Sequence, residues 1–392
     1  MKSLRRAAVD WVRAHDPCPR PSGEGRRILV DARTPVNYVM VAPVVRAMQQ
    51  DERVEFYFTA SEEPSKLREI YREAPQVRLV HPRRASVMRF DAYVASDFMW
   101  ATLLRNTCRI QVFHGVGGKY GFDAPTTSMR EWHRLFFANR RRLRNFVNAG
   151  AVDPESPAIR LVGLPKVDCL IDGSLTRWPV LEGLGLDPSK PTLLYAPTWS
   201  PASSLNAMGE EIVRRVLALG VNLIVKLHDR SQDIRWMYSG GVDWRARLQP
   251  LLPPGRAALA PGHDISPYLV AADIMITDHS SAGFEYLLLD RPIIRIHRPE
   301  LLQAALVHPD YADLLASVSE SVDEASGVTD AAMRGLTEPG ALSSRRRAVA
   351  EDLFHLPGSA TARSVAELYD ALALEPMAAS VSFQEARCQP SA

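Results

Sequence analysis

Short apolar runs alternate with helical patterns along most of the chain, and this alternation constrains the fold more than any other feature. One series begins after a Pro- and Gly-rich break at residues 19–25, and a second begins near residue 190 after an irregular stretch. Buried strands separated by helices are typical of mostly parallel sheets that carry helices on both faces. We therefore predict an α/β protein with two doubly wound, Rossmann-like domains that face each other across a cleft.

The length supports this division, because 392 residues exceed what one ordinary hydrophobic core organises. We expect an N-terminal extension, two Rossmann-like domains, a C-terminal helical segment that can return to the first domain, and a flexible tail. These predicted segments cover residues 1–25, 26–170, 188–342, 343–374 and 375–392.

Composition excludes several classes of protein. A net charge of +2 is too small for a dedicated nucleic-acid binder. The four cysteines are far apart and have neither metal-ligand nor disulfide spacing, which suits a reducing cytosol. Asp10, Arg13 and Asp16 interrupt the N-terminal apolar residues, so a signal peptide is not expected. We predict a cytoplasmic protein without a metal or cofactor.

Polar clusters follow predicted strands at four places, and open α/β sheets gather functional groups at such strand ends. In "QVFHGVGGKYGFD", His114 follows an apolar run and precedes glycines and Lys119. The glycines allow unusual backbone angles, and the lysine can face a phosphate. "YAPTWS" places Thr198 after a strand, and "VKLHD" directs Lys226 and His228 to the same side. Each cluster also has a competing interpretation: His114 can be a structural histidine, the residues of "YAPTWS" can serve packing, and Lys226 and His228 can lie on a solvated surface.

The fourth cluster, "ITDHSSAGFEYLLLDRP", is the most informative on physical grounds. A strand delivers Asp278, Ser280 and Ser281 to the start of a helix, where unpaired N–H groups and the helix dipole favour an anion. Glu285, one turn into the helix, can accept hydrogen bonds from a ribose. Serine is also a good helix N-cap, so a purely structural role explains it equally well.

In this order the clusters resemble the CDP-glycerol glycerophosphotransferase family, the catalytic domains of teichoic-acid primases and polymerases. The resemblance rests on "HG" with a lysine five residues after the histidine, "GLPKVDCL", "YAPT", "VKLHD", "ITDHSS" and "FEYLLLDRP", over roughly residues 85–300. It implies the glycosyltransferase-B architecture, with an acceptor domain followed by a nucleotide-donor domain.

The resemblance also implies roles for individual residues. His114 becomes the general base toward the acceptor hydroxyl, and His228 becomes a catalytic partner of the donor phosphates. The residues expected to bind the donor or its phosphates are Gly115, Lys119, Thr198, Lys226, Asp278, Ser280, Ser281 and Glu285. Attack of an alcohol on phosphorus needs a positioned base and donors against the developing charge, and it needs neither a metal nor a carboxylate pair.

Three positions depart from the family pattern. His279 replaces the usual tyrosine, Lys166 stands where arginine is common, and Asp229 follows the second histidine in place of proline. None of these changes removes a predicted catalytic group, but together they leave the nucleotide donor open.

The expected function is transfer of a polyol phosphate from a CDP-activated donor to a hydroxyl of a lipid-linked or polysaccharide acceptor in cell-wall or capsule synthesis. A glycosyltransferase or UDP-sugar 2-epimerase of the same fold is the alternative, and a non-enzymatic binding module is a third. Arg140, Arg141, Arg142 and Arg144 open a predicted helix, and they suggest peripheral contact at the inner face of the cell membrane. No nucleic-acid partner is expected.

Overall fold

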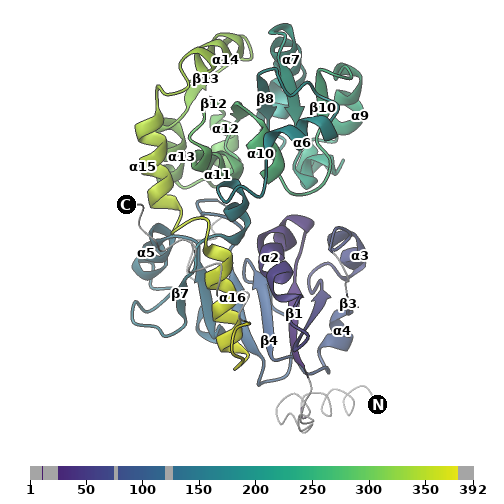
Figure 1. Ribbon diagram of the computed structural model, residues 1–392, viewed down its shortest axis with the longest axis vertical. Coiled ribbons are helices and arrows are strands. Elements are labelled where there is room, and N and C mark those ends of the chain that lie inside the picture. Colours follow the sequence, from purple (N-terminus) through teal and green to yellow (C-terminus); the bar gives the residue numbers. More distant parts are fainter. Residues whose placement is uncertain (1–10, 12–24, 75–77, 120–126, 378–392) are drawn as a thin grey trace. The chain divides into compact units, whose positions relative to one another are not determined.

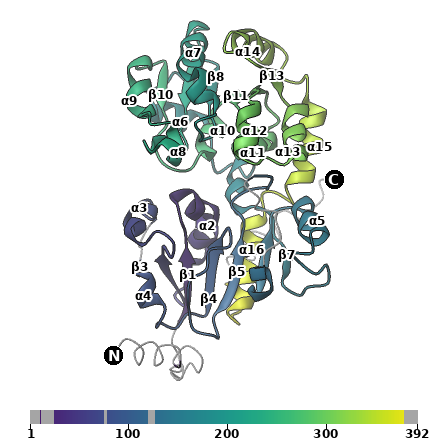
Figure 2. The same ribbon diagram turned by 180° about the vertical axis from the view of Figure 1, so that it is seen from behind.

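The protein is described from a computed structural model that covers residues 11, 25–74, 78–119 and 127–377. The chain forms two compact units, each with a sheet and surrounding helices (Figures 1 and 2). The first unit comprises the described parts of Met1–Gly115, Ala124–Asp168 and His355–Ala392, and the second those of Val116–Asp123 and Cys169–Phe354. Most of the N-terminal extension and of the C-terminal tail lies outside the described residues.

The sheet of the first unit is parallel throughout. Its described strands follow the order β3-β2-β1-β4-β5-β6-β7. They are β1 (Arg26–Asp31), β2 (Val54–Thr59), β3 (Arg78–Leu79), β4 (Ala92–Ser96), β5 (Cys108–Val112), β6 (Arg134–Phe137) and β7 (Ile159–Leu161). In β1, Ile28 and Leu29 point to opposite faces and both are fully buried, as expected of a strand covered on both sides.

Helices cover both faces of this sheet. The apolar residues of α2 and α16 pack on one face, together with Ile70 of α3, and Phe146 of α5 packs on the other. The helices of the unit are α2 (Pro35–Met48), α3 (Leu67–Ile70), α4 (Pro82–Ala85), α5 (Arg140–Asn148) and α16 (Ala360–Ala371), with short 3₁₀ turns η1 (Pro64–Lys66), η2 (Thr127–Glu131) and η3 (Pro165–Leu170). Between β2 and β3 the chain forms only η1 and the single turn α3 among the described residues.

The "GLPKVDCL" stretch holds α16 on the first unit. The Asp168 carboxylate accepts hydrogen bonds from the backbone N–H groups of Gly358, Ala360 and Thr361 at 2.7, 3.2 and 2.7 Å, and so caps the start of the helix. Gly163 has a φ of +89°, and a Cβ there would stand 2.6 Å from the His355 carbonyl oxygen. Asp168 and Gly163 of the "GLPKVDCL" stretch therefore hold a distant segment of the chain, residues 355–361, in place.

Asp51 ties α16 to the rest of the first unit. Its buried carboxylate accepts hydrogen bonds from the Arg53 guanidinium at 2.7 Å and from the Tyr369 hydroxyl at 3.0 Å. These contacts, led by that of Arg53, lower the pKa of Asp51 from 3.8 to about 2, although burial opposes the shift. The stabilisation is therefore complete above pH 3.8 and is lost as the pH falls through 2.

We expect Asp51→Asn to lower the free energy of unfolding at pH 7 by about 1–2 kcal/mol, a range reduced because Arg53 is nearly half exposed. The difference from the wild type should shrink toward pH 2, because protonation then removes the same charge from the wild type. Urea denaturation at several pH values checks this result. A difference that is equal at pH 7 and pH 2.5 would contradict it.

The sheet of the second unit is also parallel throughout. Its described strands follow the order β10-β9-β8-β11-β12-β13. They are β8 (Thr192–Tyr195), β9 (Asn222–Val225), β10 (Ala257–Leu259), β11 (Ile274–Thr277), β12 (Ile293–Ile296) and β13 (Glu320–Val322). Every residue of β8, β9, β11 and β12 is buried, so this sheet lies inside its own core.

Helices surround this second sheet as well (Figure 1). They are α6 (Arg177–Gly183), α7 (Ser204–Ala218), α8 (Trp236–Ser239), α9 (Trp244–Leu248), α10 (Ser266–Ala271), α11 (Ser281–Tyr286), α12 (Pro299–Ala304), α13 (Pro309–Ser317), α14 (Gly327–Thr337) and α15 (Ser343–Leu353), with 3₁₀ turns η4 (Asp229–Gln232), η5 (Gln249–Leu251) and η6 (Leu287–Leu289). The C-terminal helical segment breaks at "FHLPGS", so α15 belongs to the second unit and α16 to the first.

Strand order reverses once in each sheet, and the loops at these switch points carry several of the residues discussed below as a candidate site. The reversal lies between β1 and β4 in the first unit and between β8 and β11 in the second. Loops diverge there at the carboxyl ends of the strands and leave room for side chains and ligands. Asp97 follows β4, and Thr198 and Asp278 follow β8 and β11.

Candidate active site

His114 lies just past the end of β5 and contacts a buried carboxylate. Its Nδ1 is 2.5 Å from Oδ2 of Asp97, and about a third of the His114 side chain is exposed. Since Nδ1 faces Asp97, Nε2 is the ring nitrogen left to act on a substrate. The arrangement resembles that of general bases whose orientation is fixed by a carboxylate.

Asp97 is held in place by several groups. It has a φ of +52°, and its Oδ2 accepts a hydrogen bond from the Asn37 amide at 3.0 Å. Burial raises its pKa, but the charges of His114 and Arg142 and the hydrogen bond to His114 outweigh burial and lower the pKa overall. Asp97 is therefore a carboxylate at neutral pH, as orientation of a histidine base requires. The sequence analysis missed it, although "YVASD" also ends a strand with a polar residue.

Arg142 supports the same turn from inside the unit. It is 2% exposed, donates a hydrogen bond to the Gly115 carbonyl at 3.1 Å, and lies 4.0 Å from the centre of the Phe113 ring. The expectation that Arg142 faces anionic lipid is therefore wrong, because helix periodicity turns this residue toward the core. The exposed arginines of α5 are Arg140 and Arg144.

Asp278 connects the two loops at the switch point of the second unit. Oδ1 accepts hydrogen bonds from the backbone N–H groups of Thr198 and His279, both at 2.7 Å. Oδ2 accepts from the backbone N–H and the hydroxyl of Ser204, both at 3.0 Å. The carboxylate is 1% exposed and serves the protein's own backbone, so its geometry suits positioning of the loops.

The two loops that Asp278 connects also carry hydroxyl groups. The Thr198 hydroxyl is buried and, among the described residues, has no hydrogen-bond partner. Ser280 caps α11 by accepting a hydrogen bond from the Ala282 N–H at 3.3 Å, and both Ser280 and Ser281 are partly exposed. Glu285 is 3% exposed in α11, and its expected contact with a ribose stays a prediction.

His228 lies past the end of β9. Its Nδ1 accepts a hydrogen bond from the backbone N–H of Arg230 at 3.1 Å, so in the neutral ring Nε2 carries the proton. The Trp199 and His228 ring centres are 6.2 Å apart, and the Arg230 guanidinium lies 4.4 Å from the Trp199 ring centre. Trp199 and Arg230 extend the predicted cluster.

Two further charged groups border His228 in the chain. Lys226 is buried, donates to the Gly262 carbonyl, and lies 5.9 Å from the Tyr268 ring centre. Asp229 contacts Nδ1 of His263 at 2.8 Å. Burial raises the Asp229 pKa, but His263 and the charges of its neighbours lower it overall, so Asp229 is ionised.

Lys119 belongs to the second unit although His114 belongs to the first. Its ammonium group donates a hydrogen bond to the His279 carbonyl oxygen. Burial lowers the Lys119 pKa to about 8, and the negative charge of Asp278 opposes that shift. The second unit thus brings Lys119, Thr198 and the Asp278–Ser281 loop together.

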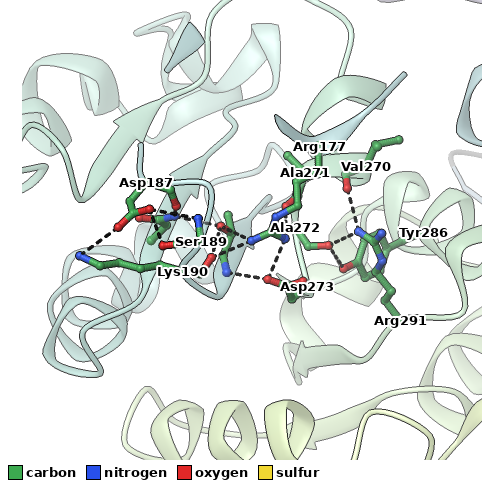
Figure 3. A network of polar contacts seen from close by, with 12 residues as sticks. Arg177, Asp187, Ser189, Lys190, Val270, Ala271, Ala272, Asp273, Tyr286 and Arg291 are labelled. Carbon is green, nitrogen blue, oxygen red and sulfur yellow. Dashed lines mark hydrogen bonds and ion pairs between the residues drawn. The ribbon is translucent and has the colours of Figure 1, made fainter. Parts of the chain in front are cut away.

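A pocket of about 580 Å³ opens at the other end of the strands of the second sheet, where β8, β11 and β12 begin. Its charged groups already have partners (Figure 3). Arg177 pairs with Asp273 at 2.8 Å, and Arg177 and Arg291 donate to the carbonyl groups of residues 270–272 that end α10. This network is explained by helix capping and by attachment of the segment before β8.

Two further properties concern the described residues alone. Among them, no group of three or more His, Cys, Asp or Glu side chains is arranged to hold a metal ion. No helix in the described part of the chain is long and apolar enough to cross a membrane.

The fold is shared with solved structures of low sequence identity. The wall teichoic acid polymerase TagF superposes with a TM-score of 0.69 at 16% identity, over 95% of this chain and 94% of that one. A UDP-GlcNAc 2-epimerase from Neisseria meningitidis, solved with UDP-GlcNAc, has a TM-score of 0.57 at 12% identity, over 88% and 100%. A comparison with curated proteins found no match.

The parallel sheets and these neighbours confirm two Rossmann-like domains in a protein of the glycosyltransferase-B type. The profile of one family, CDP-glycerol:poly(glycerophosphate) glycerophosphotransferase, matches residues 41–318. The chain belongs to this family, and it is an enzyme of the glycerophosphotransferase class. The resemblance identified from the sequence motifs is confirmed.

Proposed function

We propose that this enzyme transfers glycerol phosphate from CDP-glycerol to a hydroxyl group of a lipid-linked or polysaccharide acceptor. The pairing of His114 with Asp97 at 2.5 Å carries the proposal, because it supplies an oriented histidine in the "HG" motif, for which the sequence resemblance implies a general base. A solved TagF structure was soaked with CDP-glycerol and shares this fold with a TM-score of 0.70 at 17% identity. That structure supports the same donor here.

The reaction balances without a further reactant. The acceptor oxygen attacks the phosphorus that carries glycerol, and His114 Nε2 takes the hydroxyl proton. The new P–O bond forms as the bond to the bridging pyrophosphate oxygen breaks, and CMP leaves with the electron pair. We assign no step to a metal ion, and metal independence stays a prediction.

The second unit supplies the groups proposed to bind the donor. We assign phosphate donors to the hydroxyl groups of Ser280, Ser281 and Thr198, the last of which has no hydrogen-bond partner among the described residues, and the Nε2–H of His228 adds a fourth donor. Hydrogen bonds of this kind, aimed at developing charge, are the main source of stabilisation in phosphoryl transfer. We assign Asp278 the role of positioning these donors, because its carboxylate oxygens already accept hydrogen bonds from Thr198, Ser204 and His279.

CMP release is the direct test of this proposal. We expect CMP from CDP-glycerol plus a polyol-phosphate acceptor, slower release from CDP-ribitol, and none of the UDP that a UDP-sugar donor would yield. His228→Ala should lower kcat/KM about 10- to 100-fold, because loss of a hydrogen bond to a charged group costs about 1.5–3 kcal/mol. His297 lies past β12 and more than a third of its side chain is exposed. His297→Ala is the matched control and should retain activity.

Release of UDP from UDP-GlcNAc, without CMP from either CDP donor, would favour the alternative sugar-nucleotide enzyme. Contact with the inner face of the cell membrane stays a proposal for the exposed arginines of α5, Arg140 and Arg144. Co-sedimentation with phosphatidylglycerol vesicles tests that contact, and the role in cell-wall or capsule polymers depends on which acceptor supports turnover.

A further inference from the structure

The four residues 116–119, which we call the crossing segment, carry the chain from the first unit onto the second. His114 and Gly115 end the part that belongs to the first unit, and Val116 begins the part that belongs to the second. The crossing segment is attached at three points. Gly118 O accepts from the His308 N–H at 2.9 Å, Val116 O accepts from the Tyr311 hydroxyl at 3.3 Å, and Lys119 donates to the His279 carbonyl.

Tyr311 requires a glycine at position 118. The Gly118 backbone has a φ of +94°, and a Cβ there would stand 2.4 Å from Cγ of the Tyr311 ring. Tyr311 is 1% exposed in the first turn of α13, so its ring cannot turn aside into solvent. The unusual backbone angle expected of these glycines is present at Gly118, and the missing side chain also leaves room for the Tyr311 ring.

The same tyrosine is connected to the loop that carries the serine pair. Tyr311 packs edge-on against Phe284 with ring centres 6.1 Å apart, and Phe284 packs edge-on against His279 at 6.0 Å. Burial, followed by the charges of Lys119 and Arg295, lowers the pKa of His279 to about 2, so its ring stays neutral. Lys119 donates to the His279 carbonyl oxygen and Asp278 accepts from the His279 N–H, so both charged groups contact the residue just before Ser280.

We propose that Tyr311 is a positioning residue, which holds the crossing segment so that the Lys119 ammonium group meets the phosphates of the donor. The inference rests on the proposed function and extends it. Among the described residues Lys119 Nζ has one hydrogen-bond acceptor, the His279 carbonyl, which leaves two N–H groups for phosphate oxygens. A long lysine side chain fixed in advance loses less entropy on binding than a mobile one does.

Tyr311→Phe is the primary test, because it removes the hydroxyl bonded to Val116 O and keeps the ring that packs on Gly118 and Phe284. We expect the KM for CDP-glycerol to rise about 2- to 10-fold, which corresponds to one hydrogen bond. Tyr286→Phe is the matched control. The Tyr286 hydroxyl is buried and donates to the Ala272 carbonyl at 2.9 Å, at the end of the sheet where β11 begins (Figure 3). Its removal should leave the KM unchanged.

A double-mutant cycle separates positioning from a general loss of stability. In a Lys119→Met background, Tyr311→Phe should no longer change the KM, because the group that it positions is absent. Gly118→Ala should raise the KM more than 10-fold through the clash with the ring. Equal KM values for wild type and Tyr311→Phe, or an equal effect of Tyr311→Phe in both backgrounds, would overturn the inference. Failure of the proposed function looks different, because the wild type would then release no CMP.

Discussion

Replacing His114 with alanine is expected to lower kcat for CMP release by about 10²–10⁴-fold, the range in which a general base contributes to catalysis. His114 Nε2 is the ring nitrogen that can accept the hydroxyl proton, because Nδ1 lies 2.5 Å from the Asp97 carboxylate. Donor binding should persist, since the hydroxyl and cationic groups assigned to the donor belong to the second unit. Steady-state kinetics measures kcat, and the shift in melting temperature on addition of CDP-glycerol measures donor binding.

Two variants sharpen this prediction. Asp97→Asn should lower kcat less than His114→Ala does, because the base remains but loses the charge that orients it. His133→Ala is the matched control, because His133 is an exposed histidine of the same unit whose Nδ1 accepts from the Arg109 N–H at 3.0 Å. It precedes β6, at the opposite edge of the sheet, and should leave kcat within about twofold. A kcat for His114→Ala within threefold of wild type would refute the assignment of the base.

Asp278→Ala is expected to destabilise the second unit by about 3–5 kcal/mol, the largest effect on stability predicted for this protein. The carboxylate accepts from three backbone N–H groups and one hydroxyl, those of Thr198, His279 and Ser204. Alanine would leave these donors buried without acceptors, and each such group costs about 1–3 kcal/mol. Urea denaturation, followed together with CDP-glycerol binding, measures the loss.

Asp273→Ala provides the comparison, because Asp273 precedes the same strand that Asp278 follows. Asp273 accepts from the Thr192 N–H at 2.8 Å and pairs with Arg177, but more than a third of its side chain is exposed. Water can replace its carboxylate, so we expect a loss of only about 1 kcal/mol and unchanged donor binding. Similar losses for the two variants would show that Asp278 does not organise the loops.

Local patterns in the sequence were sufficient for the α/β class, for most strands, and for the family. Short apolar runs mark β1, β8 and β11 because strands buried on both faces carry mainly apolar side chains. The motifs around His114, His228 and Ser280 were visible for a related reason, since polar residues stand out directly after such runs. The segment 343–374 was predicted as one unit, and local patterns did not show that its two helices belong to different units.

Roles within the site depended on contacts between residues far apart in the chain. Asp278 and Thr198 are 80 residues apart and are bonded because β8 and β11 are neighbours where the strand order reverses. Asp97 meets His114 because β4 and β5 are paired, and Gly118 meets Tyr311 across almost 200 residues. Hydrophobic periodicity and turn chemistry are local, so the sequence alone established the elements and the family. Strand order and side-chain packing are long-range properties, and they distinguish the proposed base from the residues proposed to position its neighbours.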